Sequence, residues 1–257
     1  MSVAIKVDKV KFKYSNKTVL NGLNLDIEKG SFLSILGPNG SGKTTLLKNM
    51  CNLLKPYDGA IYIDNLQLKG IKYKELAKKM AVVHQGSTPN FEFKIYDIVL
   101  MGRYPHQKRF SFDSKMDLDI VKQVMLDTDI WELREKSIFE ISGGERQRVI
   151  IARALAQQPE ILLLDEPITF LDIKHQISIL NLCKKLNKEK KITIITTMHD
   201  INLASRYSDY ILLLDSGRVE VLDVPEKVIT EKNIESVYGI KVKLINGEKK
   251  VPYIIPE

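Results

Sequence analysis

A glycine-rich loop at residues 37–44, which reads GPNGSGKT, restricts the possible fold more than any other feature of this chain. Residues 31–36 form a short apolar stretch of strand length. Residues 44–54 carry apolar side chains at helical spacing, and Pro56 ends the predicted helix. The loop is therefore expected to join a strand to the N-terminus of a helix. It matches the pattern G-x-x-x-x-G-K-[ST] at Gly37, Gly42, Lys43 and Thr44.

Such a loop is suited to binding a phosphate group. Its backbone N–H groups converge on the anion, the helix dipole adds a favourable potential, and glycine permits close approach because it has no Cβ. Lys43 is expected to reach the β- and γ-phosphates of a nucleotide, and the Thr44 hydroxyl to ligate Mg²⁺. The alternative, a glycine-rich turn formed by chance, does not explain the flanking strand and helix. The residues expected to contact the nucleotide here are Gly37, Pro38, Asn39, Gly40, Ser41, Gly42, Lys43, Thr44 and Thr45.

Two adjacent carboxylates follow a second apolar strand. Residues 160–164 are continuously apolar after Glu160, as in a parallel strand that is buried on both faces, and Asp165 and Glu166 come next. Asp165 is expected to hold Mg²⁺, directly or through water. Glu166 would polarise an attacking water as general base, which typically contributes about 10²–10⁴-fold in rate. Two solvated acids at a strand end are the alternative, and the phosphate loop upstream argues against it.

A second pair of glycines opens another predicted helix at residues 142–147, which read SGGERQ. Ser142 and Glu145 have the spacing of a capping box, so a well-capped helix is the simplest interpretation. However, Gly143 and Gly144 weaken a helix and leave its N-terminal amides exposed. The pattern therefore predicts a second anion-binding site.

In this order, the motifs resemble those of the nucleotide-binding subunits of ABC transporters, over roughly residues 3–230. The family signature reads LSGGQ or LSGGE, and residues 141–145 read ISGGE. The resemblance implies an enzyme that binds and hydrolyses ATP with Mg²⁺. It also implies a homodimer on ATP binding, in which the signature of one subunit closes over the ATP held by the phosphate loop of the other. The signature residues carried over are Ser142, Gly143, Gly144 and Glu145.

Four further positions take their roles from this resemblance. Tyr14 would stack on adenine, and Gln85 would contact Mg²⁺ and water and sense a membrane partner. Asp172, in the D-loop stretch TFLD, would support the dimer interface, and His199 would touch the γ-phosphate. His84 occupies the position before Gln85 at which the family usually has proline, so the turn at these residues could differ from that of the family.

Strands and helices alternate along the chain, which predicts an α/β fold with a parallel sheet. The resemblance implies a P-loop NTPase (RecA-like) core with an antiparallel β subdomain and an inserted α-helical subdomain. We expect further strands at residues 80–84 and 191–198, a helix at 173–186 with Ile173 on its buried face, and hairpins around Ser216-Gly217 and Asn246-Gly247. The expected boundaries are core 1–86 and 158–235, antiparallel additions at 1–30 and 57–68, helical subdomain 87–157, and hairpin tail 236–257.

Composition limits the location and the partners. No stretch approaches the roughly 20 apolar residues that span a bilayer, and the N-terminus does not resemble a signal peptide. We therefore expect a cytosolic protein that reaches a membrane only through a partner, and the resemblance to transporter subunits implies a peripheral place on the cytoplasmic face of the cell membrane. The net charge of +7 is compatible with binding to nucleic acid or to anionic lipid. The lysine-rich stretches, however, resemble solvated helix faces, so no nucleic-acid partner is expected. Cys51 and Cys183 are expected to be reduced core thiols.

Residues 96–107, which read YDIVLMGRYPHQ, point to a subgroup. A stretch of the form V-x-x-G-R-x-P-H resembles the ATPases of importers for iron–siderophore complexes, haem and cobalamin, as do residues 171–176 and 199–202. The resemblance implies a groove along residues 86–106 for the coupling helix of an integral membrane permease, with a substrate-binding protein as indirect partner. Iron–siderophore import is preferred, and haem and cobalamin remain alternatives. His106 and His175 are expected to serve packing and capping rather than iron binding.

Soluble ABC ATPases form the main alternative class. DNA-repair types carry long coiled-coil insertions, whereas about a hundred residues separate Gly42 from Ser142 here. Translation-factor types carry two cassettes. The ATPase of iron–sulfur cluster assembly is a single cassette of similar length and remains the serious rival, although the GRYPH stretch argues against it. A P-loop kinase would need an acceptor site rather than a water-activating Glu166.

Overall fold

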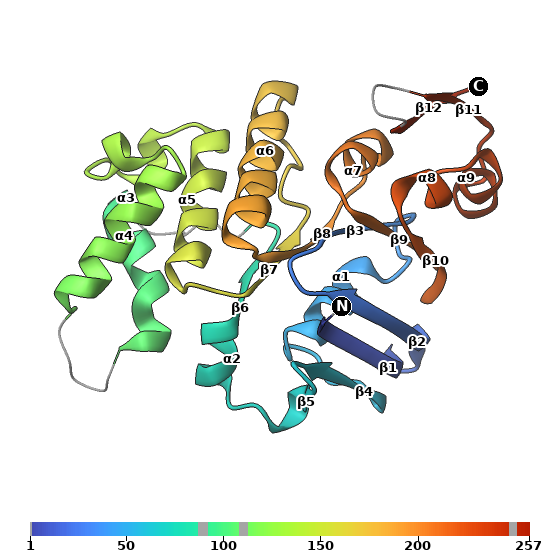
Figure 1. Cartoon of the computed structure of the whole chain (residues 1–257), viewed down its shortest axis with the longest axis horizontal. Helices are drawn as coiled ribbons and strands as arrows, with labels where there is room; N and C mark the ends of the chain where they lie inside the picture. Colours follow the sequence, from blue (N-terminus) through green and yellow to red (C-terminus); the bar gives the residue numbers. More distant parts are fainter. Residues whose placement is uncertain (1, 87–91, 108–112, 247–250) are drawn as a thin grey trace. The chain divides into compact units, whose positions relative to one another are not determined.

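The computed structural model describes residues 2–86, 92–107, 113–246 and 251–257 (Figure 1). Its residues form two compact units, one made of residues 1–71 and 187–257 and the other of residues 72–186. The two units are described separately below.

The first unit contains an antiparallel sheet with the strand order β2-β1-β4-β5. Buried and exposed residues alternate over much of β1 and β2, so one face of the sheet packs on the core and the other faces solvent. The predicted antiparallel addition is confirmed. The strands are β1 (Val3–Tyr14), β2 (Lys17–Glu28), β4 (Asp58–Ile63) and β5 (Leu66–Gln67), and the 3-10 turn η1 (Leu68–Gly70) follows.

The core of the first unit is a group of parallel strands. Strand β3 (Phe32–Leu36) pairs in parallel with β8 (Thr193–Thr197) on one side and with β9 (Tyr210–Asp215) on the other. All five residues of β3 and of β8 are buried, as expected for parallel strands covered on both faces. Strand β10 (Arg218–Asp223) forms the predicted hairpin with β9.

Helices follow two of these strands. Helix α1 (Lys43–Met50) begins at the glycine-rich loop, and α7 (Ile201–Tyr207) follows β8. The predicted end of the first helix at residue 54 is wrong by four residues. Asn52 has a φ of 61°, so the chain leaves the helical path soon after Met50.

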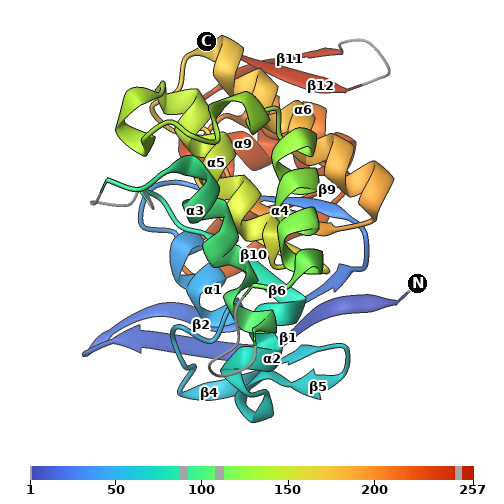
Figure 2. The same cartoon turned by 90° about the vertical axis from the view of Figure 1, so that its left-hand side faces the viewer.

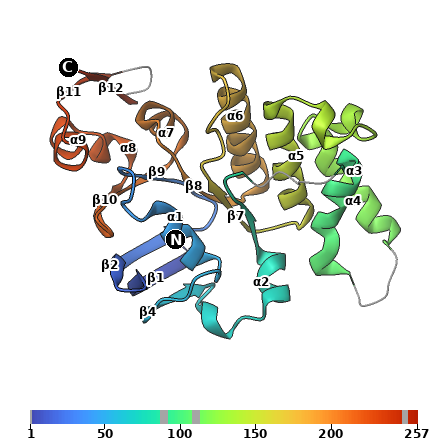
Figure 3. The same ribbon diagram turned by 180° about the vertical axis from the view of Figure 1, so that it is seen from behind.

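The C-terminal part of the first unit contains two short helices and a hairpin (Figure 3). Helices α8 (Pro225–Val228) and α9 (Glu231–Tyr238) precede β11 (Val242–Asn246) and β12 (Pro252–Pro256). The two strands pair antiparallel, so the predicted hairpin is confirmed. Its predicted turn at Asn246-Gly247 extends outside the described residues.

In the second unit, strands β6 (Met80–Val83) and β7 (Ile161–Asp165) pair in parallel. The described residues between these strands form helices and turns and no named strand, as predicted, and α3, α4 and α5 pack on one another (Figure 2). These elements are α2 (Tyr73–Lys79), which precedes β6, then α3 (Ile95–Leu100), η2 (Met101–His106), α4 (Lys115–Asp127), η3 (Trp131–Leu133), η4 (Ile138–Glu140) and α5 (Gly143–Ala156).

Helix α6 (Ile173–Lys190) begins in the second unit. Leu180 and Cys183 are fully buried, as its periodicity predicts, but Ile173 is 72 % exposed. The prediction for Ile173 is wrong because this residue opens the helix directly after an exposed loop, before the packed part of the helix begins. Both cysteines are free and buried, which confirms the prediction of reduced core thiols.

A buried ion pair fastens the GRYPH stretch inside the second unit. The Arg103 side chain is 2 % exposed, and its Nε donates to Asp117 Oδ1 at 2.8 Å. Its Nη1 donates to the carbonyl of Ala156 at 2.6 Å and to Gln158 Oε1 at 3.0 Å. One guanidinium therefore joins η2 to α4 and to the end of α5.

Among the described residues, no helix is both long and apolar enough to cross a membrane.

Arg103→Ala is expected to destabilise the protein by about 3–5 kcal/mol, because it leaves the Asp117 carboxylate without its buried cationic partner. Lys94→Ala is the matched control, since Lys94 pairs with Glu135 where both side chains are well exposed. Chemical denaturation measures both variants. An equal, small shift in the two unfolding midpoints would contradict the structural role of Arg103.

Candidate active site

The glycine-rich loop lies between β3 and α1, as predicted. Lys43 is only 6 % exposed, and its ammonium donates to the carbonyls of Gly37 at 2.8 Å and Pro38 at 3.1 Å. A lysine charge is thus held inside the loop by backbone dipoles. Together with the N-terminus of α1, it makes this loop a site for an anion.

Gly37 is required for steric reasons. Its φ is 148°, and a Cβ at this position would collide with the backbone carbonyl of Leu214 on β9. The loop is also braced from outside, because the Gly217 amide donates to the carbonyl of Ser41 at 3.0 Å. The first glycine of the pattern therefore lets the loop pack closely against the hairpin that follows β9.

The other predicted residues of the first unit lie on separate elements. Tyr14 ends β1 with 46 % of its surface exposed, and its ring lies edge-on against Phe12, with 4.9 Å between the ring centroids. His199 is exposed and lies between β8 and α7. The exposed Tyr14 ring is a surface on which a nucleotide base can stack. His199 follows the end of β8, as predicted.

In the second unit, the two carboxylates lie at the end of β7. Asp165 is 4 % exposed and ends the strand. Glu166 follows with a φ of 51°, in the left-handed region that non-glycine residues rarely adopt. Such a conformation costs on the order of 1–3 kcal/mol and persists only where the surroundings enforce it. Because of this backbone conformation, the Glu166 side chain does not continue the alternating pattern of the side chains in β7.

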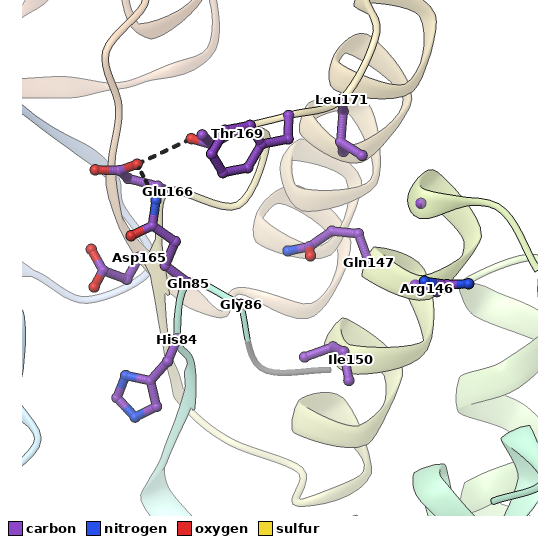
Figure 4. Close-up of a pocket in the computed structure, with 12 residues that line it drawn as sticks. His84, Gln85, Gly86, Arg146, Gln147, Ile150, Asp165, Glu166, Thr169 and Leu171 are labelled. Carbon is purple, nitrogen blue, oxygen red and sulfur yellow. Dashed lines mark hydrogen bonds between the residues drawn. The ribbon is translucent and has the colours of Figure 1, made fainter. Parts of the chain in front are cut away.

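Two side chains hold the Glu166 carboxylate (Figure 4). Gln85 Nε2 donates to Glu166 Oε2 at 2.7 Å, and Thr169 Oγ1 donates to the same oxygen at 3.2 Å. Gln85 follows β6, which is the parallel neighbour of β7, so pairing of the strands brings these residues together. Figure 4 shows the His84 ring pointing away from Glu166, so the residue that replaces the usual proline does not enter this contact.

Helix α5 begins at the signature with the predicted capping box. Glu145 Oε2 accepts from both the amide and the hydroxyl of Ser142 at 2.8 Å, and the Ser142 hydroxyl accepts from the Glu145 amide at 3.3 Å. The hydrogen bonds from the Ser142 backbone and hydroxyl hold the pKa of Glu145 below its usual range. A charged carboxylate therefore caps the helix at neutral pH.

The D-loop contacts the signature through a residue that was not predicted to do so. Asp172 Oδ1 accepts from the His175 amide at 2.9 Å and lies 2.8 Å from His175 Nδ1. The ring held in this way packs against Gly144, where a Cβ would overlap it. The hydrogen bonds from the His175 amide and ring hold the pKa of Asp172 below its usual range. Asp172 is thus the cap, and His175 is a packing residue, as we expected, whose ring fills the space beside Gly144 of the signature.

A cavity of about 320 Å³ in the second unit gathers several of the predicted residues. Its lining includes both carboxylates, Gln85, the signature residue Gly143 and the D-loop residues that precede Asp172. The structure thus brings Gln85, Asp165, Glu166 and Gly143 to one cavity. From the sequence, Thr169 is assigned only to the D-loop stretch; its position three residues after Glu166 is the feature of the sequence that agrees with its hydrogen bond to this carboxylate.

Gly144→Ala tests the packing of the signature. Alanine normally stabilises a helix by about 1 kcal/mol relative to glycine. Here the added methyl overlaps the His175 ring, so we expect a net loss of about 1–3 kcal/mol. In a His175→Ala background the same substitution should be neutral or stabilising. Urea unfolding of the four proteins measures this, and an equal loss in both backgrounds would exclude His175 as the cause.

Comparison with known proteins agrees with this geometry. Residues 20–169 match the model of the ABC transporter family. The chain is 37% identical to the ferric enterobactin transport ATP-binding protein of Escherichia coli, over 95% of this chain and 90% of that protein. It is 38% identical to a petrobactin import ATP-binding protein of Bacillus anthracis, over 98% of this chain and 93% of that protein.

Solved structures show the same fold. A structure described as a metal-chelate type ABC transporter in an inward-facing conformation superposes with a TM-score of 0.87 at 26% identity, over 100% of this chain and 98% of that one. The motifs, the site and these similarities agree, and the chain belongs to the ABC transporter family as one of its ATP-binding subunits.

Proposed function

We propose that this protein is the ATP-hydrolysing subunit that powers an importer of metal chelates, with iron–siderophore complexes as the preferred cargo. The observation that carries the proposal is the arrangement at the end of β7, where Gln85 and Thr169 hold the carboxylate of Glu166. Near full-length similarity to ATP-binding proteins for ferric enterobactin and petrobactin supports the class of cargo.

The phosphate loop would bind the triphosphate of ATP. Lys43 is already held by two loop carbonyls, so its ammonium needs little reorganisation to meet the β- and γ-phosphates. Loop amides and the N-terminus of α1 add further donors and a favourable potential. The exposed Tyr14 ring would stack on adenine, and His199 would contact the γ-phosphate.

The oxygen donors present suit Mg²⁺, a hard cation that prefers carboxylate, hydroxyl and amide oxygens. Thr44, Gln85 and Asp165 would hold the ion, which neutralises phosphate charge when it is bound. Asp165 supplies the carboxylate of this set, and it is almost fully buried at the end of β7.

Glu166 would act as general base for the water that attacks the γ-phosphate. Its carboxylate is oriented by Gln85 and Thr169 and by its left-handed backbone, so it is placed before ATP arrives. A positioned base of this kind contributes about 10²–10⁴-fold in rate. Gln85 would also couple the permease to the general base. A movement of Gln85 caused by the permease would shift Glu166, because one hydrogen bond joins these two side chains.

The signature residues 142–145 would bind the ATP of a second copy, so two copies would pair around two ATP molecules. The amides of Gly143 and Gly144, which lie between the two amides used in the capping box of α5, would make this contact, and Asp172 would support the interface. Integral membrane permease subunits would dock along residues 86–106, part of which lies outside the described residues. Exposed Met101 and Tyr104 lie in this stretch. A substrate-binding protein would deliver the chelate, and the chain would sit on the cytoplasmic face of the membrane.

We also propose that the chain works as a single ABC ATPase domain with the core, helical subdomain and tail boundaries given above. Haem and cobalamin remain alternative cargoes, because a cargo that never touches the ATPase leaves no mark on this site. The soluble ATPase of iron–sulfur cluster assembly remains the alternative of another class.

Glu166→Gln is expected to retain ATP binding and to lose hydrolysis by at least about a hundredfold, because an amide cannot accept the proton of water. The ATP-bound dimer should then accumulate. Steady-state phosphate release and size-exclusion chromatography with ATP and Mg²⁺ measure both effects. Glu75→Gln, at a surface ion pair on α2, should behave as wild type. Near-normal hydrolysis by Glu166→Gln would contradict the assignment of the base.

Ser142→Arg is expected to block dimer closure while ATP binding by the monomer is retained, because a large cation would occupy the signature face. Ser142→Ala is the matched control, since it removes the helix cap, typically worth about 1 kcal/mol, without adding bulk. The dimer fraction of each variant is measured with ATP in a Glu166→Gln background. An unchanged dimer fraction in Ser142→Arg would refute the role of the signature.

A further inference from the structure

Helix α7 in the first unit ties His199 to the C-terminal hairpin. The helix begins at Ile201, two residues after His199. Asp200 between them is the N-cap, and its Oδ1 accepts from the Leu203 amide at 2.8 Å. The backbone that carries His199 is therefore continuous with a capped helix, so a change in the position of α7 changes the position of His199.

Helix α7 lies beside β12 (Figure 1), and two of its side chains bind the backbone of that strand. Asn202 Oδ1 accepts from the Ile254 amide at 2.9 Å, and Asn202 Nδ2 donates to the Ile254 carbonyl at 3.2 Å. Ser205, which is 2 % exposed, donates to the Pro252 carbonyl at 2.7 Å. Asn202 thus pairs with Ile254 as a strand residue would, and truncation would leave both backbone groups without these partners.

The same C-terminal segment reaches the phosphate loop. The Leu244 amide of β11 donates to Glu231 of α9 at 3.3 Å, so the hairpin is joined to that helix. At the end of α9, the buried hydroxyl of Tyr238 lies near the backbone of Gly37, and it has no hydrogen-bond partner among the described residues. Burial raises the pKa of Tyr238 to about 12, and the Gly37 backbone opposes that shift. The described residues after Thr230 therefore include a side chain near the phosphate loop and a strand bound to the helix that follows His199.

We propose that Asn202 is a positioning residue for ATP hydrolysis, which clamps the C-terminal hairpin to α7 and so fixes the position of His199 relative to the phosphate loop. The inference rests on the proposed function, in which His199 contacts the γ-phosphate. It gives the tail beyond α9 a role in turnover. A bond of purely structural value would instead affect stability alone.

The chain offers a matched control for Asn202. Asn24 on β2 also accepts a backbone amide, that of Lys9, at 2.9 Å, and donates to a backbone carbonyl, that of Gly22, at 3.3 Å. Asn202→Ala and Asn24→Ala therefore remove similar pairs of hydrogen bonds, one beside α7 and one in the antiparallel sheet. Thermal unfolding of both variants reports the structural effect, and steady-state ATP hydrolysis is measured well below the unfolding temperature.

In Asn202→Ala, kcat is expected to fall by about tenfold or more while KM changes little, since a displacement of about 1 Å at a catalytic group can cost about a hundredfold. Asn24→Ala should keep the wild-type kcat. Asn202→Asp should resemble Asn202→Ala, because it replaces the donor to the Ile254 carbonyl with a carboxylate oxygen that repels this carbonyl, which offsets the retained acceptor for the Ile254 amide. If Asn202→Ala does not fold, Ser205→Ala removes one bond of the same clamp and takes its place.

The double variant Asn202→Ala/His199→Ala tests whether the effect passes through His199. If it does, the double variant should have the kcat of His199→Ala alone, because coupled residues are not additive. An undiminished additional loss would overturn the inference, as would equal kcat values for Asn202→Ala and wild type. In those cases the proposed function stands, since the wild type hydrolyses ATP. A wild type without ATP hydrolysis, assayed with and without its permease, overturns both.

Discussion

The pair of hydrogen bonds on the Glu166 carboxylate is the interaction on which the account of this protein depends. It requires β6 and β7 to pair in parallel, because that pairing brings Gln85 beside the end of β7. It also requires Glu166 to adopt a positive φ, which the following turn with Thr169 stabilises. The strand register, the strained backbone and the two donors together place one oxygen. If Glu166 is the general base, as we propose, its carboxylate would be in place when substrate binds, so little reorganisation would remain for the chemical step.

Local rules made much of the site readable from the sequence. The phosphate loop, the capping box at Ser142 and the carboxylates after β7 each depend on neighbours within a few residues, and each has the expected local structure. The wrong predictions concern residues whose structure depends on tertiary packing or on the backbone conformation of a single residue. Apolar spacing placed Ile173 on the buried face of α6, although the first turn of that helix is exposed, and the left-handed Asn52 ends α1 early.

The contacts that sequence reasoning could not supply join residues far apart in the chain. Arg103 binds Asp117 on α4, the last carbonyl of α5 and Gln158 after it; His175 packs on Gly144, and Asn202 pairs with Ile254. Each of these residues lies in a stretch that marked the subgroup, namely GRYPH, LDIKHQ or HDIN. The sequence marked them as distinctive without showing their partners, because only the fold determines which backbone groups they meet. In this chain each of the three contacts braces a helix: Arg103 joins α4 to α5, His175 packs on α5, and Asn202 binds α7 to β12.

The central claim, that this ATPase works with a membrane permease, is tested most directly by affinity capture. The tagged Glu166→Gln protein is incubated with ATP and Mg²⁺ and with gently solubilised membranes of the source cell, and the captured proteins are identified by mass spectrometry. The account predicts a permease with many membrane-spanning helices, encoded beside a chelate-binding protein. Capture of soluble iron–sulfur assembly proteins alone would contradict it.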